Sequence, residues 1–128
     1  MKPGMAIGQS ETLQLKVTPD MFAEFGGQVV HPAYSTAWMV YHMEWASRLI
    51  ILPYLEDGEE GMGAEVSLKH IAPARDQDEI TVTATVSLLE GNAVWTDVQA
   101  RTTSKLIGAG SVKQVILPKL KINKLLKT

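Results

Sequence analysis

The chain has 128 residues, a formal net charge of −2 and no cysteine. We expect a single domain, 1–128, because a chain of this length can bury a core of its own. The lack of cysteine excludes disulfides, thiolate metal sites and cysteine nucleophiles. We expect no metal and no bound cofactor. The opening residues, MKPGMAIGQSE, lack the apolar segment of a secretory signal, so the expected location is the cytoplasm.

Charge is unevenly distributed along the chain. All fourteen acidic residues fall at or before Asp97, and only basic residues carry charge from Val98 onward. This basic end is either solvated surface or a region that attracts an anionic ligand, such as a phosphorylated cofactor. Nucleic acid is not an expected partner, because no aromatic residues interleave with the basic tail.

Two short elements are expected before a long apolar stretch. Apolar and polar residues alternate from Leu13 to Val17 and predict a strand. Phe22 and Phe25 follow, at the i, i+3 spacing of one helical turn that places both rings on one side. This pair belongs either to a satellite of the core or to a ligand contact. His31-Pro32 then requires an extended or turn conformation.

The stretch from Tyr34 to Leu55 predicts one long helix. Ser35 is a favoured N-cap residue, and Pro53 disturbs the last turn. Apolar and aromatic side chains lie on both sides of this helix, so we expect protein to enclose it nearly all round. The stretch is long enough to span a membrane, but its histidine, glutamate and arginine argue against a bilayer. We therefore expect no membrane partner.

The sequence after the helix predicts four strands, which are Ala64–Ala72, Ile80–Leu88, Val94–Thr103 and Leu106–Leu117. Glu90-Gly91-Asn92 predicts a hairpin turn, and Gly108-Ala109-Gly110 predicts a bulge or a close backbone approach. This order of elements predicts an α+β fold in which one helix covers an antiparallel sheet. A helix that is apolar on both sides needs a second cover, and the simplest one is another copy of the chain. We expect a homodimer.

Three side chains form a candidate catalytic set. His70 is expected, with Ala64, on the strand face that meets the helix, and Glu44 on the part of the helix near that face. A carboxylate that is hydrogen-bonded to an imidazole supports general acid–base chemistry. Thr36 adds a hydroxyl at the helix start, where free backbone N–H groups favour an oxyanion. Thr36 and Glu44 lie about 12 Å apart at ~1.5 Å per helical residue, so a third group or a substrate must lie between them.

Each of these residues also has a purely structural interpretation. His70 alone fits a histidine of the core. Glu44 fits an i, i+4 ion pair with Arg48. Thr36 fits capping chemistry shared with Ser35. The structural interpretation is favoured for each residue taken singly, whereas the three together form a plausible site.

The sequence resembles the hotdog-fold thioesterases, and among them the fluoroacetyl-CoA thioesterase-like family. The likeness covers nearly the whole chain, in the segments MKPGMAIG at 1–8, FAEF at 22–25, TAWMVYHMEWA at 36–46, LPYLEDGEEGMGAEVSLKH at 52–70 and LIGAGSVKQVIL at 106–117. In that family a threonine at the helix start, a glutamate eight residues on and a histidine 26 residues after that form the catalytic set. The same spacings here select Thr36, Glu44 and His70.

This resemblance implies a hotdog fold, in which an antiparallel sheet wraps around one long central helix, and hydrolysis of a small acyl-CoA thioester. It also implies that the backbone N–H of Gly63 contacts the thioester carbonyl and that Phe22 and Phe25 match a phenylalanine lid. CoA is then a part of the substrate, with its phosphates drawn to the basic C-terminal part. The connection 26–35 is longer than in the fluoroacetyl-specific member, so its substrate is not carried over.

Other functions remain open at this point. A hotdog-fold hydratase or dehydratase needs an acid–base pair but no hydroxyl nucleophile, and an acyl-CoA-binding module needs no catalysis at all. The sequence does not define the acyl chain, nor whether Thr36, Glu44 or a water activated by His70 attacks the thioester. It leaves open a dimer or a dimer of dimers, and a site completed by a second chain.

Overall fold

The computed structural model of the protein describes residues 1–127. Its elements in chain order are β1 (Ser10–Lys16), the 3-10 turn η1 (Pro19–Met21), β2 (Phe22–Phe25), β3 (Gln28–Tyr34), α1 (Thr36–Ile51), the 3-10 turn η2 (Leu52–Tyr54), β4 (Glu59–His70), β5 (Glu79–Glu90), β6 (Ala93–Arg101), β7 (Leu106–Pro118) and α2 (Lys119–Leu126). Among these described residues, no helix combines the length and the apolar character needed to cross a membrane.

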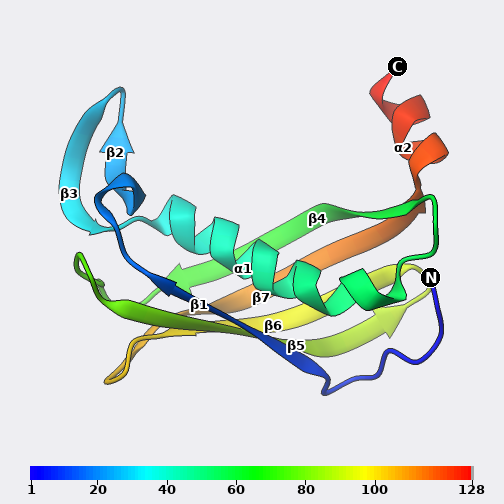
Figure 1. Cartoon of the computed structure of the whole chain (residues 1–128), viewed down its shortest axis with the longest axis horizontal. Coiled ribbons are helices and arrows are strands. Elements are labelled where there is room, and N and C mark those ends of the chain that lie inside the picture. Colours follow the sequence, from blue (N-terminus) through cyan, green and yellow to red (C-terminus); the bar gives the residue numbers. More distant parts are fainter. Residues whose placement is uncertain (128) are drawn as a thin grey trace.

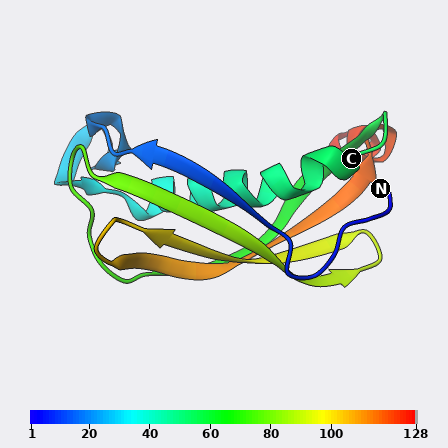
Figure 2. The same cartoon turned by 60° about the horizontal axis from the view of Figure 1, so that its bottom comes forward.

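Five strands form one antiparallel sheet in the order β1-β5-β6-β7-β4, and α1 runs along one face of it. Figures 1 and 2 show the sheet curving under this helix. The predicted α+β architecture is confirmed, as are the four consecutive strands after the helix. The hairpin turn at Gly91 is confirmed too, because β5 ends at Glu90 and β6 begins at Ala93.

The start of α1 is fixed by a side-chain cap. Ser35 has an extended backbone, and its Oγ accepts a hydrogen bond of 3.1 Å from the Trp38 backbone N–H. This bond satisfies one of the free donors of the first turn, as predicted for an N-cap. At the other end the helix stops at Ile51, and Pro53 lies in the 3-10 turn that follows.

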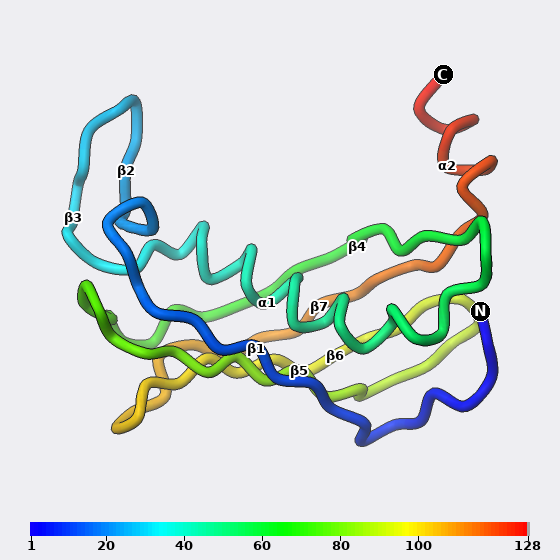
Figure 3. Tube along the Cα trace, viewed as in Figure 1, coloured from blue at the N-terminus to red at the C-terminus, as the bar shows by residue number. Residues whose placement is uncertain are grey.

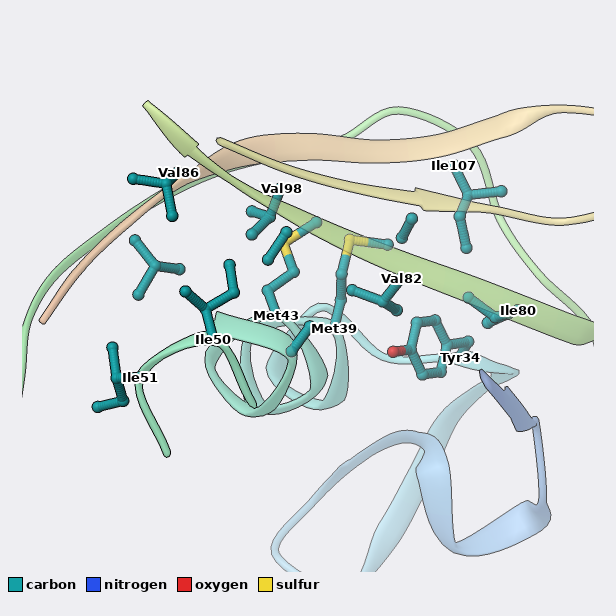
Figure 4. Packing of buried hydrophobic residues seen from close by; sticks show 14 of the residues in the cluster. Tyr34, Met39, Met43, Ile50, Ile51, Ile80, Val82, Val86, Val98 and Ile107 are labelled. Atoms are coloured by element: carbon teal, nitrogen blue, oxygen red, sulfur yellow. The ribbon is translucent and has the colours of Figure 1, made fainter. Parts of the chain in front are cut away.

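The core lies between α1 and the sheet. Figure 4 shows Met39, Met43 and Ile50 of the helix pointing toward the sheet, where buried aliphatic side chains of β5, β6 and β7 receive them. From Ile80 to Val86 the residues of β5 alternate, so Ile80, Val82, Ala84 and Val86 are buried on this face and the residues between them are not. This pattern is that of a sheet with one covered face. Beyond Val86 the register against β6 shifts, and Leu88 is exposed.

The opposite side of α1 is not covered within one chain. Tyr41 is 51% exposed and Trp45 is 45% exposed, although both are large aromatic residues. The prediction that protein encloses the helix nearly all round is therefore not met by the chain alone. Adjacent exposed aromatic residues of this size mark a surface that another molecule can cover.

Two predictions for short segments were wrong. Phe22 and Phe25 lie in strand β2, which pairs with β3 in a separate two-stranded hairpin, instead of on a helical turn. Residues three apart in a strand point to opposite faces, so the two rings do not share a side. Ala64 was expected on the inner face of its strand, but the register of β4 against β7 shifts there, and Ala64 is exposed.

The Gly108-Ala109-Gly110 motif marks a close approach, and the register of β7 is regular at these residues. A Cβ on Gly108 would overlap the sulfur of Met39, so this glycine lets α1 lie low on the sheet. A Cβ on Gly110 would overlap the carbonyl oxygen of Ser67 and would lie 2.7 Å from Leu68 Cα, both on the neighbouring strand.

We expect Gly110→Ala to lower the free energy of unfolding by about 1–3 kcal/mol, the usual cost of overpacking. The added methyl would meet backbone atoms of β4, which cannot move without opening the pairing with β7. Denaturant unfolding of this variant beside Ser111→Ala, the next residue of β7, measures the effect. Equal midpoints for the two variants would contradict a close approach at Gly110.

Candidate active site

Thr36 and His70 meet at one end of the molecule. Thr36 is the first residue of α1, His70 is the last residue of β4, and Thr36 Oγ1 lies 2.8 Å from His70 Nδ1. In the tautomer that carries its proton on Nε2, Nδ1 accepts a hydrogen bond from the hydroxyl. A hydroxyl that donates to a neutral imidazole is the arrangement that activates a nucleophile.

The environment of His70 favours its neutral form. Burial lowers the pKa of His70 below its usual 6.5, and a contact with the backbone of Ala72 opposes this shift. Its Nδ1 faces the Thr36 hydroxyl. Its Nε2 is enclosed and has no hydrogen-bond partner among residues 1–127. A base must be unprotonated to accept a proton, and the lowered pKa keeps it so at neutral pH.

The Thr36–His70 pair opens into a cavity of about 560 Å³. Thr36, His70, Tyr34 and residues 71–73 line one side of it, and Ala23 and His31 of the β2–β3 hairpin line the other. Neither Phe22 nor Phe25 lines this cavity. Phe22 is half-buried against the core, whereas Phe25 is exposed near the tip of the hairpin.

Glu44 lies two helical turns away and lines a different cavity. This second cavity, of about 410 Å³, lies between α1 and the strands β4 and β7, and its lining includes Gly63. A Cβ on Gly63 would lie 2.9 Å from Glu44 Oε1, so the carboxylate rests directly over this glycine. Within the described part of the chain, no hydrogen bond joins Glu44 to Thr36 or to His70. The structure thus brings the predicted residues together in two pairs.

The alternative ion pair of Glu44 with Arg48 is wrong. Arg48 binds Glu60 of β4 with two hydrogen bonds, of 2.7 Å and 3.1 Å. The hydrogen bonds from Arg48 and from the Gly61 backbone lower the pKa of Glu60 to about 2. The Glu44 carboxylate is therefore left to face the second cavity.

Sequence reasoning missed a buried polar pair and a buried amide side chain at the site. Tyr34 Oη lies 2.7 Å from His42 Nδ1, and the Tyr34 ring meets the His70 ring edge-on with 6.5 Å between centroids. Burial raises the pKa of Tyr34 and lowers that of His42, so both stay neutral. The amide side chain belongs to Gln114 of β7, which lies opposite Gly63 and whose buried Nε2 has no partner in residues 1–127. Cross-strand register decides the placement of Gln114, and one sequence does not show it.

Known proteins are similar to this chain in sequence and in fold. A family model described as fluoroacetyl-CoA-specific thioesterase matches residues 17–120. The fluoroacetyl-CoA thioesterase of Streptantibioticus cattleyicolor is 31% identical over 96% of this chain and 93% of its own length. A Thermus thermophilus hypothetical protein, described as a thioesterase superfamily member, is 43% identical with a TM-score of 0.94, over 99% of this chain and 93% of that one.

A variant of the fluoroacetyl-CoA-specific thioesterase, solved in complex with fluoroacetate and CoA, is 29% identical with a TM-score of 0.86. The match covers 93% of this chain and 100% of that one. These likenesses confirm the predicted hotdog fold and the predicted class of thioester hydrolase. Because the family model and this relative both extend over most of its length, the chain belongs to the family of fluoroacetyl-CoA-specific thioesterases.

Proposed function

We propose that the protein hydrolyses a small acyl-CoA thioester to the free acid and CoA. The observation that carries this proposal is the Thr36–His70 pair, with 2.8 Å between Oγ1 and Nδ1 at the wall of a cavity of about 560 Å³. A related thioesterase holds fluoroacetate and CoA in its structure, which supports a CoA thioester as substrate. The reaction needs only water as co-reactant, so we expect no resident cofactor.

The geometry favours Thr36 as the attacking group. His70 takes the hydroxyl proton, and Oγ1 attacks the thioester carbonyl carbon. The C–S bond then breaks, and the CoA thiolate leaves with the proton from the imidazolium. Water next attacks the acyl-threonine with His70 again as base, which releases the acid and restores the hydroxyl. The free N–H groups in the first turn of α1 stabilise the oxyanion in both steps.

We further propose that two copies pair through β4 and share each site. Within the sheet β4 pairs only with β7, so its other edge is open, and an open edge of twelve residues is a template for a second strand. Antiparallel self-pairing centred on Ser67 sets Glu65 of one copy opposite Lys69 of the other, an opposite-charge pair on the exposed face.

This register also explains the separation of the two pairs. It places His70 of one copy opposite Ala64 of the other, beside the second copy's Gly63 and Glu44. One complete site then takes its hydroxyl and base from one chain, and its carboxylate and the Gly63 backbone N–H from the other. The Glu44 carboxylate stabilises the imidazolium, and the Gly63 N–H contacts the thioester carbonyl.

The roles of the hairpin and the location in the cell stay predictions. Phe25 lies on the same side of β2 as Ala23, which lines the cavity, so the hairpin is suited to contact the acyl group or the CoA chain. A cytoplasmic location is tested by fractionation of cells that produce the protein.

Thiol release from a panel of acyl-CoAs, short to long and including fluoroacetyl-CoA, tests the reaction. We expect turnover on a short member and a loss of about 10²-fold or more in His70→Ala, the scale of a missing general base. Thr36→Ala should lose activity, whereas Thr36→Ser should keep most of it. If Thr36→Ala keeps full thiol release, water or Glu44 attacks the thioester instead of Thr36. If no member releases thiol, the thioesterase proposal fails, and addition of water to an enoyl-CoA without thiol release would favour a hydratase.

The pH dependence of kcat/KM reports the base in the free enzyme. Burial lowers the pKa of His70, so its protonated, inactive form accumulates only below 6.5. We therefore expect kcat/KM to fall as the pH drops through an apparent pKa below 6.5 and to be level just above it. His31→Gln, which changes another histidine of the same cavity, should keep this limb. A limb at or above pH 7 would mean that the Glu44 carboxylate of the second copy outweighs burial at His70, and a kcat/KM that does not change with pH would contradict His70 as the base.

Mixed dimers test the shared site. His70→Ala and Glu44→Gln are each expected to be nearly inactive as homodimers. A mixed dimer contains one intact site, with His70 from one chain and Glu44 from the other. An equal mixture that re-pairs at random contains about half mixed dimers, so mixing should restore thiol release to roughly a quarter of the wild-type rate. The matched control mixes His70→Ala with Thr36→Ala, which removes a residue from each site and should restore nothing. Light scattering reports the dimer itself, and a monomer would end this part of the proposal.

A further inference from the structure

Two segments project beyond β4 on its open side, at opposite ends of the molecule. Figures 1 and 3 show the β2–β3 hairpin at one end and helix α2 at the other, separated by the full length of the sheet. The hairpin is attached beside the last residue of β4, because its residues share a cavity with His70. Helix α2 is attached beside the first residue of β4, because Glu59 pairs with Pro118 and the Lys119 N–H donates to the Gly58 carbonyl.

Both segments expose apolar side chains. Phe25 of the hairpin is 73% exposed, and Val29 and Val30 beside it are exposed as well. On α2, Leu120 is 78% exposed and Leu126 is 73% exposed. An eight-residue helix is too short to be stable alone in water, so a helix of this length with no buried residue needs a surface to lie on.

The charges of the two segments are opposite. Helix α2 and its C-cap carry four lysines and no acidic residue, namely Lys119, Lys121, Lys124 and Lys127. The hairpin with the turn before it, residues 19–34, carries Asp20 and Glu24 and neither lysine nor arginine. The two surfaces therefore attract each other as well as offering apolar contact.

The symmetry of the dimer brings these segments together. In the antiparallel register centred on Ser67, the Glu59 end of one β4 strand extends past the His70 end of the other, toward the hairpin of that copy. We propose that α2 of each copy docks on the β2–β3 hairpin of the other copy, with its leucines against Phe25, Val29 and Val30. The contact rests on the β4-paired dimer proposed above. It commits to a second copy of this chain as the occupant of both surfaces.

This docking has a consequence for substrate binding. The hairpin borders the cavity that holds Thr36 and His70, so the lysines of the docked helix stand at the rim of the other copy's cavity. Ammonium groups at that rim meet the phosphates of CoA while its thioester lies at the reacting pair. The basic charge of the C-terminal part of the chain then serves to bind the phosphates of CoA.

A disulfide test has no background from native thiols, because the chain contains no cysteine. Gln28→Cys and Asn123→Cys replace exposed polar residues of the hairpin and of α2 and leave the apolar contact intact. The two positions are at opposite ends of one chain, and a disulfide needs Cα atoms within about 7 Å, so only a bridge between copies can form. We expect the double variant, and mixtures of the two single variants, to give a covalent dimer under mild oxidation.

The controls separate the contact from the dimer and from the activity. Gln28→Cys with Ser87→Cys, an exposed residue of β5, should give no covalent dimer, and neither should each single variant alone. A dimer in light scattering without a cross-link would overturn the docking and leave the thioesterase proposal untouched. A monomer would overturn the docking together with the dimer. Co-sedimentation of α2-intact protein with phosphatidylglycerol vesicles, in place of cross-linking, would assign α2 to a lipid surface and also overturn it.

The role of the α2 lysines in phosphate binding is tested by a separate measurement of KM. In Lys121→Gln/Lys124→Gln we expect KM for the acyl-CoA to rise about three- to tenfold, the scale of a few exposed charge contacts. KM for the same acyl group on N-acetylcysteamine, which carries no phosphate, should not change. Lys16→Gln on β1, at the other edge of the sheet, is the matched control. Equal effects on both thioesters would remove the lysines from the phosphate site.

Discussion

The close seating of α1 on the sheet is the constraint on which the site depends. Three glycines of β4 and β7 lie under the helix, and each faces one helical side chain. Gly61 faces Ile51, Gly63 faces Glu44 and Gly108 faces Met39; at each position a Cβ would lie 2.9 Å or less from that side chain. A methyl at any of these positions would require that helical side chain to shift. The three glycines thus let side chains from both ends and the middle of the helix lie close to the sheet.

This seating fixes where the candidate catalytic groups lie. Because α1 begins at the Ser35 cap and β4 ends at His70, the first helical hydroxyl and the last strand side chain come within 2.8 Å. Tyr34 is buried beside His70: its hydroxyl lies within hydrogen-bond distance of His42, and its ring meets the His70 ring edge-on. One neutral, buried side chain, Tyr34, therefore supports His70, and this support suits the base proposed for the reaction, whose position must not drift.

Much of this arrangement could be predicted from the sequence. The alternation in β5 and the cap at Ser35 are local signals, and local chemistry decided both. The pairing of Thr36 with His70 came from family spacing. The β2–β3 hairpin was missed because two phenylalanines at i, i+3 fit a helical turn as well as a strand. The bulge at Ala64 was missed because the register against β7 is set by the neighbouring strand, as is the placement of Gln114 beside Gly63.

The sequence did not predict that Glu44 and His70 lie in separate cavities of one chain. Helix geometry alone required a gap of about 12 Å between Thr36 and Glu44, and a single chain offers no way to close it. The exposed ring of Trp45 and the open edge of β4 lie on the same side as the second cavity, so the surface that is incomplete for packing is also incomplete for chemistry. In the proposed dimer, one second copy on that surface would cover the aromatic residues, pair the strand edge and supply the Glu44 carboxylate. The proposal therefore links catalysis to assembly, because the same surface would complete both the packing of the helix and the site.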